Sequence, residues 1–292
     1  MKDYMVRAIT KDVPLRAFVA TTKNLVQHAK NAHNLTPLTS AALGRVLTAT
    51  AMMGAMLKNK DDKLTIQLKG DGPVNTFLTT GNGKGQVKGY VGVPNVNLPL
   101  KSSGKLDVGG AIGKGTLTII MDLGLKEPYV GKVSLVNGEI AEDLAHYYAV
   151  SEQIPSAVSL GVLVDRDMSI KAAGGFIIQV MPDCPDHVVE TLEKRILDLP
   201  SISHSLSERK SPEEILTTVL QDFDVEFSER IDVEYSCDCN RVRLEQVLIS
   251  LGELELWDII KKEGKADVQC HFCNKEYHFT KDQLKELLKN SK

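Results

Sequence analysis

The chain has 292 residues, 42% of them hydrophobic, and a formal net charge of −3. This composition excludes a fibrous or disordered chain, and the length fits one large domain with a smaller one. The polar start Met1–Tyr4 does not resemble a signal peptide, and the one long apolar run, residues 41–57, contains Arg45, which favours a buried helix over a membrane span. We therefore expect a cytoplasmic protein that makes no membrane contact.

The charge is unevenly distributed, and this divides the chain into three predicted parts. Residues 1–180 carry 20 basic and 14 acidic side chains, residues 181–230 carry 5 and 12, and residues 231–292 carry 10 and 12. The acidic middle indicates a boundary on each side of it. We predict a core domain over 1–180, a helical linker over 181–230 and a small metal-binding module over 231–292.

The first part shows short alternating segments interleaved with helical ones. This pattern predicts an α+β domain with a mixed β-sheet and packed helices. Two strands are expected within residues 2–20, further strands at 64–68, 74–80, 85–91, 116–121, 130–136, 157–164 and 169–181, and helices at 22–33, from a cap at Thr39 or Ser40 to 57, and at 139–153.

A glycine-rich segment, Gly109–Thr116, superficially resembles a phosphate-binding loop. It has three residues instead of four between Gly109 and the Gly-Lys pair, and Gly115 replaces the hydroxyl residue that would hold Mg²⁺. We interpret it as a glycine turn rather than a nucleotide site.

The middle part contains two predicted helices with narrow apolar faces. Asp186 can cap the first, and Ser211 with Glu214 forms a capping box with proline at the first helical position of the second. Their apolar positions, such as Leu192 and Ile215, need cover from a neighbour, which we expect to be residues 1–180. The segment is either a solvated linker or a switch element of low stability.

Four of the five cysteines lie near the C-terminal end as Cys237-x-Cys239 and Cys270-x-x-Cys273, and Cys184 stands alone. Four thiolates in two tight pairs supply the ligands of a tetrahedral Zn²⁺. A closed structural zinc site and a redox role both remain open on spacing alone.

A nucleic-acid-binding zinc module is disfavoured because the linker is acidic and the last part has no clear basic face. A thioredoxin-like enzyme is disfavoured because a strand-like segment, not a helix, follows the second pair.

The tight C-x-C pair favours a redox role in addition to a structural one. Each pair, Cys237 with Cys239 and Cys270 with Cys273, can close on itself as a disulfide once the metal leaves, and a bridge between cysteines two apart is strained and readily reversed. Oxidation would expel the metal and with it a folding free energy of about 10–16 kcal/mol for small zinc modules. The module would then unfold, and a marginal linker packed nearby could unfold with it.

These motifs resemble the 33 kDa chaperonin family (heat shock protein 33), the redox-regulated holdase chaperones. Besides the cysteine pattern, the resemblance rests on Gly70–Pro73, on Tyr147-Tyr148 before Ser151–Ser156, on Ala172–Phe176 and on Tyr277 after the second cysteine pair. It implies a non-enzymatic, ATP-independent chaperone that is inactive while reduced and zinc-bound. On oxidation such a protein releases zinc, unfolds its switch and linker, dimerises and binds unfolding proteins.

The resemblance assigns the four metal ligands one for one to Cys237, Cys239, Cys270 and Cys273, and it gives no role to Cys184. The competing hypothesis is a zinc-stabilised binding module without redox switching.

Overall fold

The computed structural model describes residues 2–290 and divides the chain into two compact units, Met1–Ser236 and Cys237–Lys292. The three-part division predicted above remains a prediction. Residues 181–236 all lie within the first unit.

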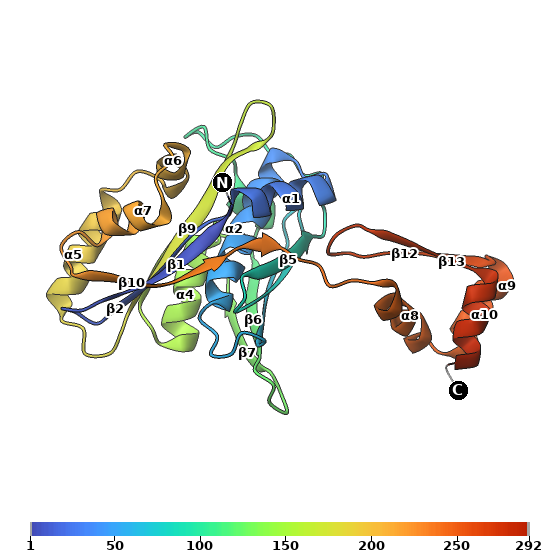
Figure 1. Ribbon diagram of the computed structural model, residues 1–292. Coiled ribbons are helices and arrows are strands. Elements are labelled where there is room, and N and C mark those ends of the chain that lie inside the picture. Colours follow the sequence, from blue (N-terminus) through green and yellow to red (C-terminus); the bar gives the residue numbers. More distant parts are fainter. Residues whose placement is uncertain (1, 291–292) are drawn as a thin grey trace. The chain divides into compact units, whose positions relative to one another are not determined.

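The first unit is built on two sheets, where the sequence predicted one (Figure 1). One is fully antiparallel, in the order β10-β1-β2-β9-β8, and the other is mixed, in the order β11-β5-β4-β3-β6-β7, with only the β11–β5 pair parallel. The strands of the first sheet are β1 (Tyr4–Thr10), β2 (Leu15–Thr21), β8 (Ser156–Val164), β9 (Ile170–Val180) and β10 (Val225–Asp232). Those of the second are β3 (Lys63–Gly70), β4 (Thr76–Asn82), β5 (Gln86–Val91), β6 (Gly115–Asp122), β7 (Tyr129–Ser134) and β11 (Glu234–Tyr235). The α+β fold class and the nine predicted strands of residues 1–180 are confirmed.

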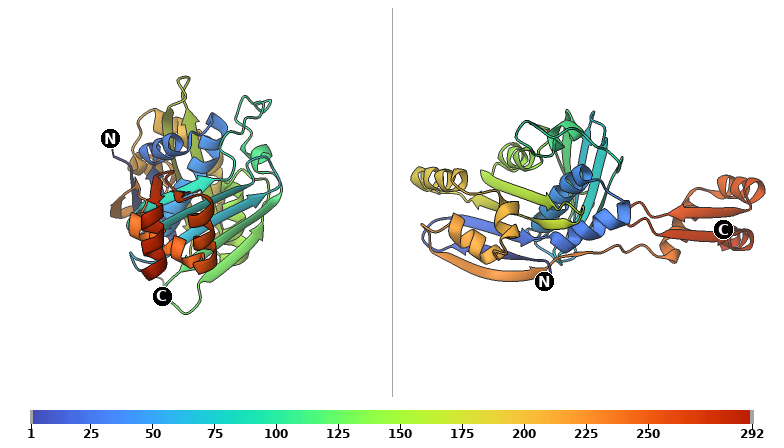
Figure 2. Two further views of the ribbon diagram at one scale, coloured as in Figure 1. Left: turned by 90° about the vertical axis from the view of Figure 1, so that its right-hand side faces the viewer. Right: turned by 90° about the horizontal axis from the view of Figure 1, so that it is seen from above.

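Helix α2 (Pro37–Gly54) packs against strands of both sheets, as seen from above in Figure 2. Every residue of α2 except Pro37 and Arg45 is buried, which explains its small and apolar composition. The predicted cap at Thr39 or Ser40 is wrong: Thr36 caps the helix, with proline at the first helical position, because the Thr36 hydroxyl accepts the N–H of Thr39.

The remaining helices of residues 1–180 are α1 (Lys23–His33), the short α3 (Val108–Ile112), α4 (Ala141–Tyr147) and the π-helical turn η1 (Tyr148–Glu152). The glycine-rich segment therefore contains a five-residue helix and a turn at Gly113, instead of the turn alone that we predicted. Carboxylates of this chain already accept the backbone N–H groups of Gly109, Gly110 and Lys114, so a phosphate would find no free donor at those three positions.

Three helices, α5 (Asp186–Leu197), α6 (Ile202–Ser207) and α7 (Pro212–Val219), cover the outer face of the antiparallel sheet (Figure 1). Alternation along the strands separates the two faces of this sheet. Met5, Phe18 and Ile177 point to the core around α2, whereas Tyr4, Val19 and Phe176 point to the linker helices. The helices bury Val188, Leu192, Ile202, Ile215, Leu216 and Val219 on that face. The expected cover of the linker by residues 1–180 and the Ser211–Glu214 capping box are confirmed.

Helix α6 and strand β10 were not predicted. Strand β10 pairs with β1 at the edge of the sheet, and the backbone then bonds to the second sheet through β11. The last such bond joins the Ser236 N–H to the Val87 carbonyl at 2.9 Å, one residue before Cys237.

The second unit consists of α8 (Arg241–Ser250), α9 (Glu253–Lys262), the hairpin β12 (Lys265–Gln269) and β13 (Glu276–Thr280), and α10 (Lys281–Asn290). Asn240 caps α8, and Thr280 with Gln283 forms the turn that opens α10. Its apolar core is small and includes Leu248, Ile260, Phe279 and Leu284. Across residues 2–290, no helix has the length and apolarity needed to cross a membrane.

Candidate metal centre

Two loops of the second unit carry the four cysteines. Cys237 and Cys239 precede α8, and the Asn240 cap, which accepts the Arg243 N–H at 2.9 Å, fixes where this loop ends. Cys270 and Cys273 lie in the turn between β12 and β13. The Cys270 N–H bonds across this turn to the Lys275 carbonyl at 3.0 Å, and the Cys273 N–H bonds back to the Cys270 carbonyl at 3.3 Å.

The sulfur atoms of the four cysteines all lie within 4.8 Å of one another. Cys237 Sγ is 3.7 Å from Cys270 Sγ, and Cys239 Sγ is 3.3 Å from Cys273 Sγ, so the thiols are close but unbonded. A tetrahedral Zn²⁺ with Zn–S bonds of about 2.3 Å requires sulfurs about 3.8 Å apart. The donor set and its spacing therefore fit one tetrahedral metal ion, and the four cysteines are positioned to bind it.

The local electrostatics differ among the thiols. Burial, supported by hydrogen bonds from neighbouring thiols, raises the pKa of Cys273 to about 11 and raises the pKa of Cys237 further. Burial also acts to raise the pKa of Cys239, but hydrogen bonds from the Tyr277 hydroxyl and the other three thiols outweigh it and lower this pKa to about 7. Of these three thiols, Cys239 most readily becomes the thiolate that a metal needs.

Cys184, the fifth cysteine, is not part of this cluster. It lies just before α5, half-buried against the core under the linker helices, with Sγ 3.9 Å from the Pro185 carbonyl. This placement agrees with its treatment as incidental to the metal site.

The sequence analysis named Tyr277 only as part of the family resemblance and gave it no role at the site. Its hydroxyl lies 3.4 Å from Cys239 Sγ and donates to the Cys239 carbonyl at 3.2 Å. The signal was the alternation along the strand that leaves the second cysteine pair, which turns Tyr277 and Phe279 to the same buried face. What the sequence could not show is that the first cysteine pair folds back onto that face.

Fold and site together define a two-sheet domain with a helical cover, followed by a small unit with a four-cysteine metal site. A family model described as Hsp33 protein matches residues 3–280. Proteins named 33 kDa chaperonin are similar along their full length. That of Agathobacter rectalis is 49% identical over 287 residues, 98% of this chain and 100% of the relative, and that of Caldanaerobacter subterraneus is 48% identical over 292 residues, 100% and 99% of the two chains.

The crystal structure of a 33 kDa chaperonin (Heat shock protein 33 homolog) from Thermotoga maritima has the same fold, with a TM-score of 0.91, 41% identity and 99% of both chains covered. The chain belongs to the Hsp33 family of chaperones.

Proposed function

We propose that this chain is a redox-regulated, ATP-independent holdase whose four clustered cysteines hold one Zn²⁺ while reduced. The observation that carries the proposal is the set of four unbonded sulfurs within 4.8 Å in a unit with a small apolar core. Bound Zn²⁺ supplies folding free energy, of about 10–16 kcal/mol in small zinc modules, which this unit would lose with the metal.

The oxidative step balances with a peroxide as the named oxidant. Two thiolates of one pair lose two electrons and form one S–S bond, while one H₂O₂ takes up those electrons with two protons and becomes two waters. Two such steps convert Cys237 with Cys239, and Cys270 with Cys273, into disulfides. Four metal-ligating thiolates disappear, and the Zn²⁺ is released. Loop closure within each pair costs less chain entropy than closure between distant pairs.

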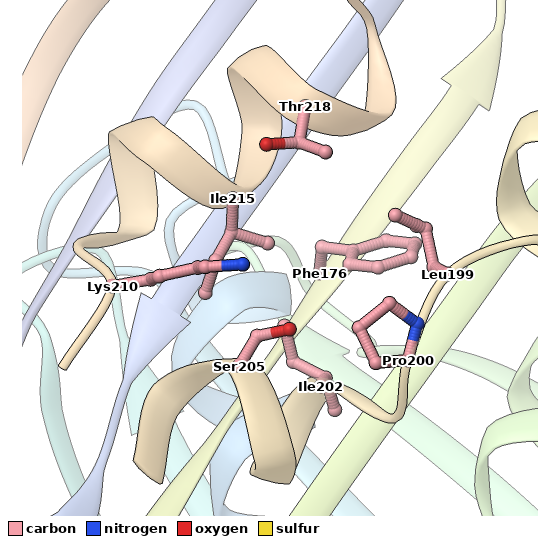
Figure 3. Close-up of a pocket in the computed structure, with 8 residues that line it drawn as sticks. All are labelled: Phe176, Leu199, Pro200, Ile202, Ser205, Lys210, Ile215 and Thr218. Atoms are coloured by element: carbon pink, nitrogen blue, oxygen red, sulfur yellow. The ribbon is translucent and has the colours of Figure 1, made fainter. Parts of the chain in front are cut away.

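The packing of the linker helices supports a further part of the proposal, that the linker unfolds after the metal is lost. A small pocket of about 30 Å³ lies between α6, α7 and β9. Figure 3 shows its lining, in which the polar ends of Ser205 and Lys210 lie beside the rings of Phe176 and Pro200. Apolar packing is incomplete at this place. We propose that the linker is a low-stability cover over an apolar sheet face.

Opposite charges do little to hold this cover. Among the described residues, the ion pairs between residues 181–230 and residues 1–180 are Lys11–Glu226 at 3.4 Å and Lys60–Glu229 at 3.9 Å, both on β10, and all four side chains are about half exposed or more. Exposed pairs of this kind contribute at most about 1 kcal/mol each. Apolar burial is then the main force that docks the linker, and the surface it hides is an apolar patch that can bind unfolded chains.

Unfolding of the second unit and undocking of the linker are connected through the polypeptide chain itself. The chain passes from β11, a strand of two residues, through Ser236 directly into Cys237. Unfolding of the second unit therefore acts on a short strand that follows β10 and the linker. We further propose that activation produces a homodimer, that clients are unfolding or aggregation-prone proteins, and that the protein is cytoplasmic and is neither an enzyme nor a nucleic-acid-binding protein.

Metal release and chaperone activity, followed together, test this function. Peroxide is added to the zinc-loaded protein, and released zinc is recorded with a chromogenic chelator while light scattering follows the aggregation of a thermally unfolding client. We expect the reduced protein to leave the client unprotected and the oxidised protein to suppress its aggregation. Zinc release without protection, or equal protection in both states, would favour the alternative of a zinc-stabilised binding module without redox switching.

A further inference from the structure

Tyr277 connects the two halves of the metal centre through its own side chain. It lies on β13 opposite Val268, and so belongs to the hairpin that carries Cys270 and Cys273. Its hydroxyl reaches the other loop, 3.4 Å from Cys239 Sγ and 3.2 Å from the Cys239 carbonyl. The ring is 9% exposed and packs in the apolar core of the second unit.

A tyrosine hydroxyl has one proton to donate, and here two acceptors of the same residue compete for it. When Cys239 is a metal ligand, its sulfur is a thiolate and accepts only. Hydrogen bonds to an ionised acceptor are roughly twice as strong as those to a neutral one. The proton of the Tyr277 hydroxyl therefore shifts from the carbonyl towards the sulfur once the metal is bound.

We propose that Tyr277 is a positioning residue of the metal centre, which donates a hydrogen bond to the Cys239 thiolate and thereby retains the metal and slows oxidation of that sulfur. The inference rests on the proposed metal site. A donated hydrogen bond withdraws electron density from the thiolate, and it also ties the loop of the first cysteine pair to the hairpin of the second. Both effects oppose the first step of switching, in which a ligand sulfur leaves the metal and meets the oxidant.

Substitutions at Tyr277 and at its neighbour Phe279 separate the hydrogen-bond role of Tyr277 from ordinary core packing. Phe279, two residues further along β13, is 1% exposed in the same core, and it has no hydroxyl to offer a sulfur. Tyr277→Phe removes the donor and keeps the ring, whereas Phe279→Leu loosens the core and leaves the donor in place. Tyr129→Phe is a matched control, since the Tyr129 hydroxyl lies in the first unit, 3.3 Å from Ser151 Oγ and away from the four cysteines.

The test uses Co²⁺ as the spectroscopic probe in the full-length, reduced protein. Titration of the metal-free protein with Co²⁺ in competition with a chelator gives the dissociation constant, whether or not the unit is folded before the metal binds. The energy of the sulfur-to-cobalt charge-transfer band reports electron density on the thiolates in the loaded form.

We expect Tyr277→Phe to weaken Co²⁺ and Zn²⁺ binding about 10–100-fold, to shift the charge-transfer band to lower energy and to accelerate peroxide-driven zinc release. Phe279→Leu should weaken binding without moving the band, and Tyr129→Phe should change neither. An unmoved band in Tyr277→Phe, or an unchanged dissociation constant, overturns the proposal. These readouts involve no client protein, so their failure is distinguishable from a failure of the proposed holdase function.

Discussion

Opening of the linker can be tested apart from oxidation with two substitutions on one helix. Leu192 and Leu197 are both on α5. Leu192 is 3% exposed, because it packs in the core between the linker helices and the sheet, whereas Leu197 is 84% exposed. Truncation of a buried leucine costs about 2–5 kcal/mol, and an unpaired buried carboxylate adds to this cost. At 1.4 kcal/mol per tenfold, loss of the leucine alone should raise the population of undocked linker about 30-fold to 4,000-fold, and the buried carboxylate of Leu192→Asp should raise it further.

Leu197→Asp is the control, because it introduces the same charge on the solvent side of the same helix. A carboxylate in the last helical turn costs only about 0.3–1 kcal/mol. The assay is aggregation suppression by the reduced, zinc-loaded variants, with hydrogen exchange over residues 186–219. We expect fast exchange and client protection from Leu192→Asp, and neither from Leu197→Asp. Fast exchange in Leu192→Asp without protection would refute the claim that linker opening is sufficient for activity.

The other predictions concern the metal, the disulfides and pH. Protein purified under reducing conditions should contain about one zinc per chain by metal analysis, and a folded, metal-free second unit would contradict this. Peptide mapping after oxidation should find Cys237–Cys239 and Cys270–Cys273, although sulfur contacts of 3.7 and 3.3 Å in the reduced form run between the pairs; dominant cross-pair bridges would contradict it. Burial raises the pKa of Asp3 to about 6 from 3.8, so the folded state binds its proton more tightly than the unfolded state, and about 3 kcal/mol of stability is lost as pH rises from 4 through 6. Asp3→Asn should remove this part of the pH dependence in urea unfolding followed by circular dichroism, and an unchanged profile would argue against it.

Local signals predicted much of the architecture. Alternation located the strands of residues 1–180, and the Ser211–Glu214 capping box located a helix start because it depends on side chains a few residues apart. The α2 start was misplaced because three hydroxyl residues, Thr36, Thr39 and Ser40, compete as caps, and the deciding feature was Pro37.

Features that depend on distant partners could not be predicted. Strand β10 is rich in charge and largely exposed, and Glu229 interrupts the alternation of Val225, Phe227 and Ile231, so the sequence signal was weak and its pairing with β1 decides that it is a strand. The separation into two sheets is likewise a matter of which strands pair. The four cysteines of the candidate metal centre could be predicted from their spacing, whereas the contact of Tyr277 with Cys239 spans 38 residues and depends on how the two loops meet.

Hydrogen exchange of the wild-type protein, reduced against oxidised, tests the central claim most directly. The claim is that oxidation of the second unit undocks the linker from a sheet that stays folded. We predict that oxidation removes protection from residues 186–219 and 237–290 together, while β2 and β9, the central strands of the sheet under the linker, exchange as slowly as before. Loss of protection in residues 237–290 with α5–α7 still protected would contradict the account.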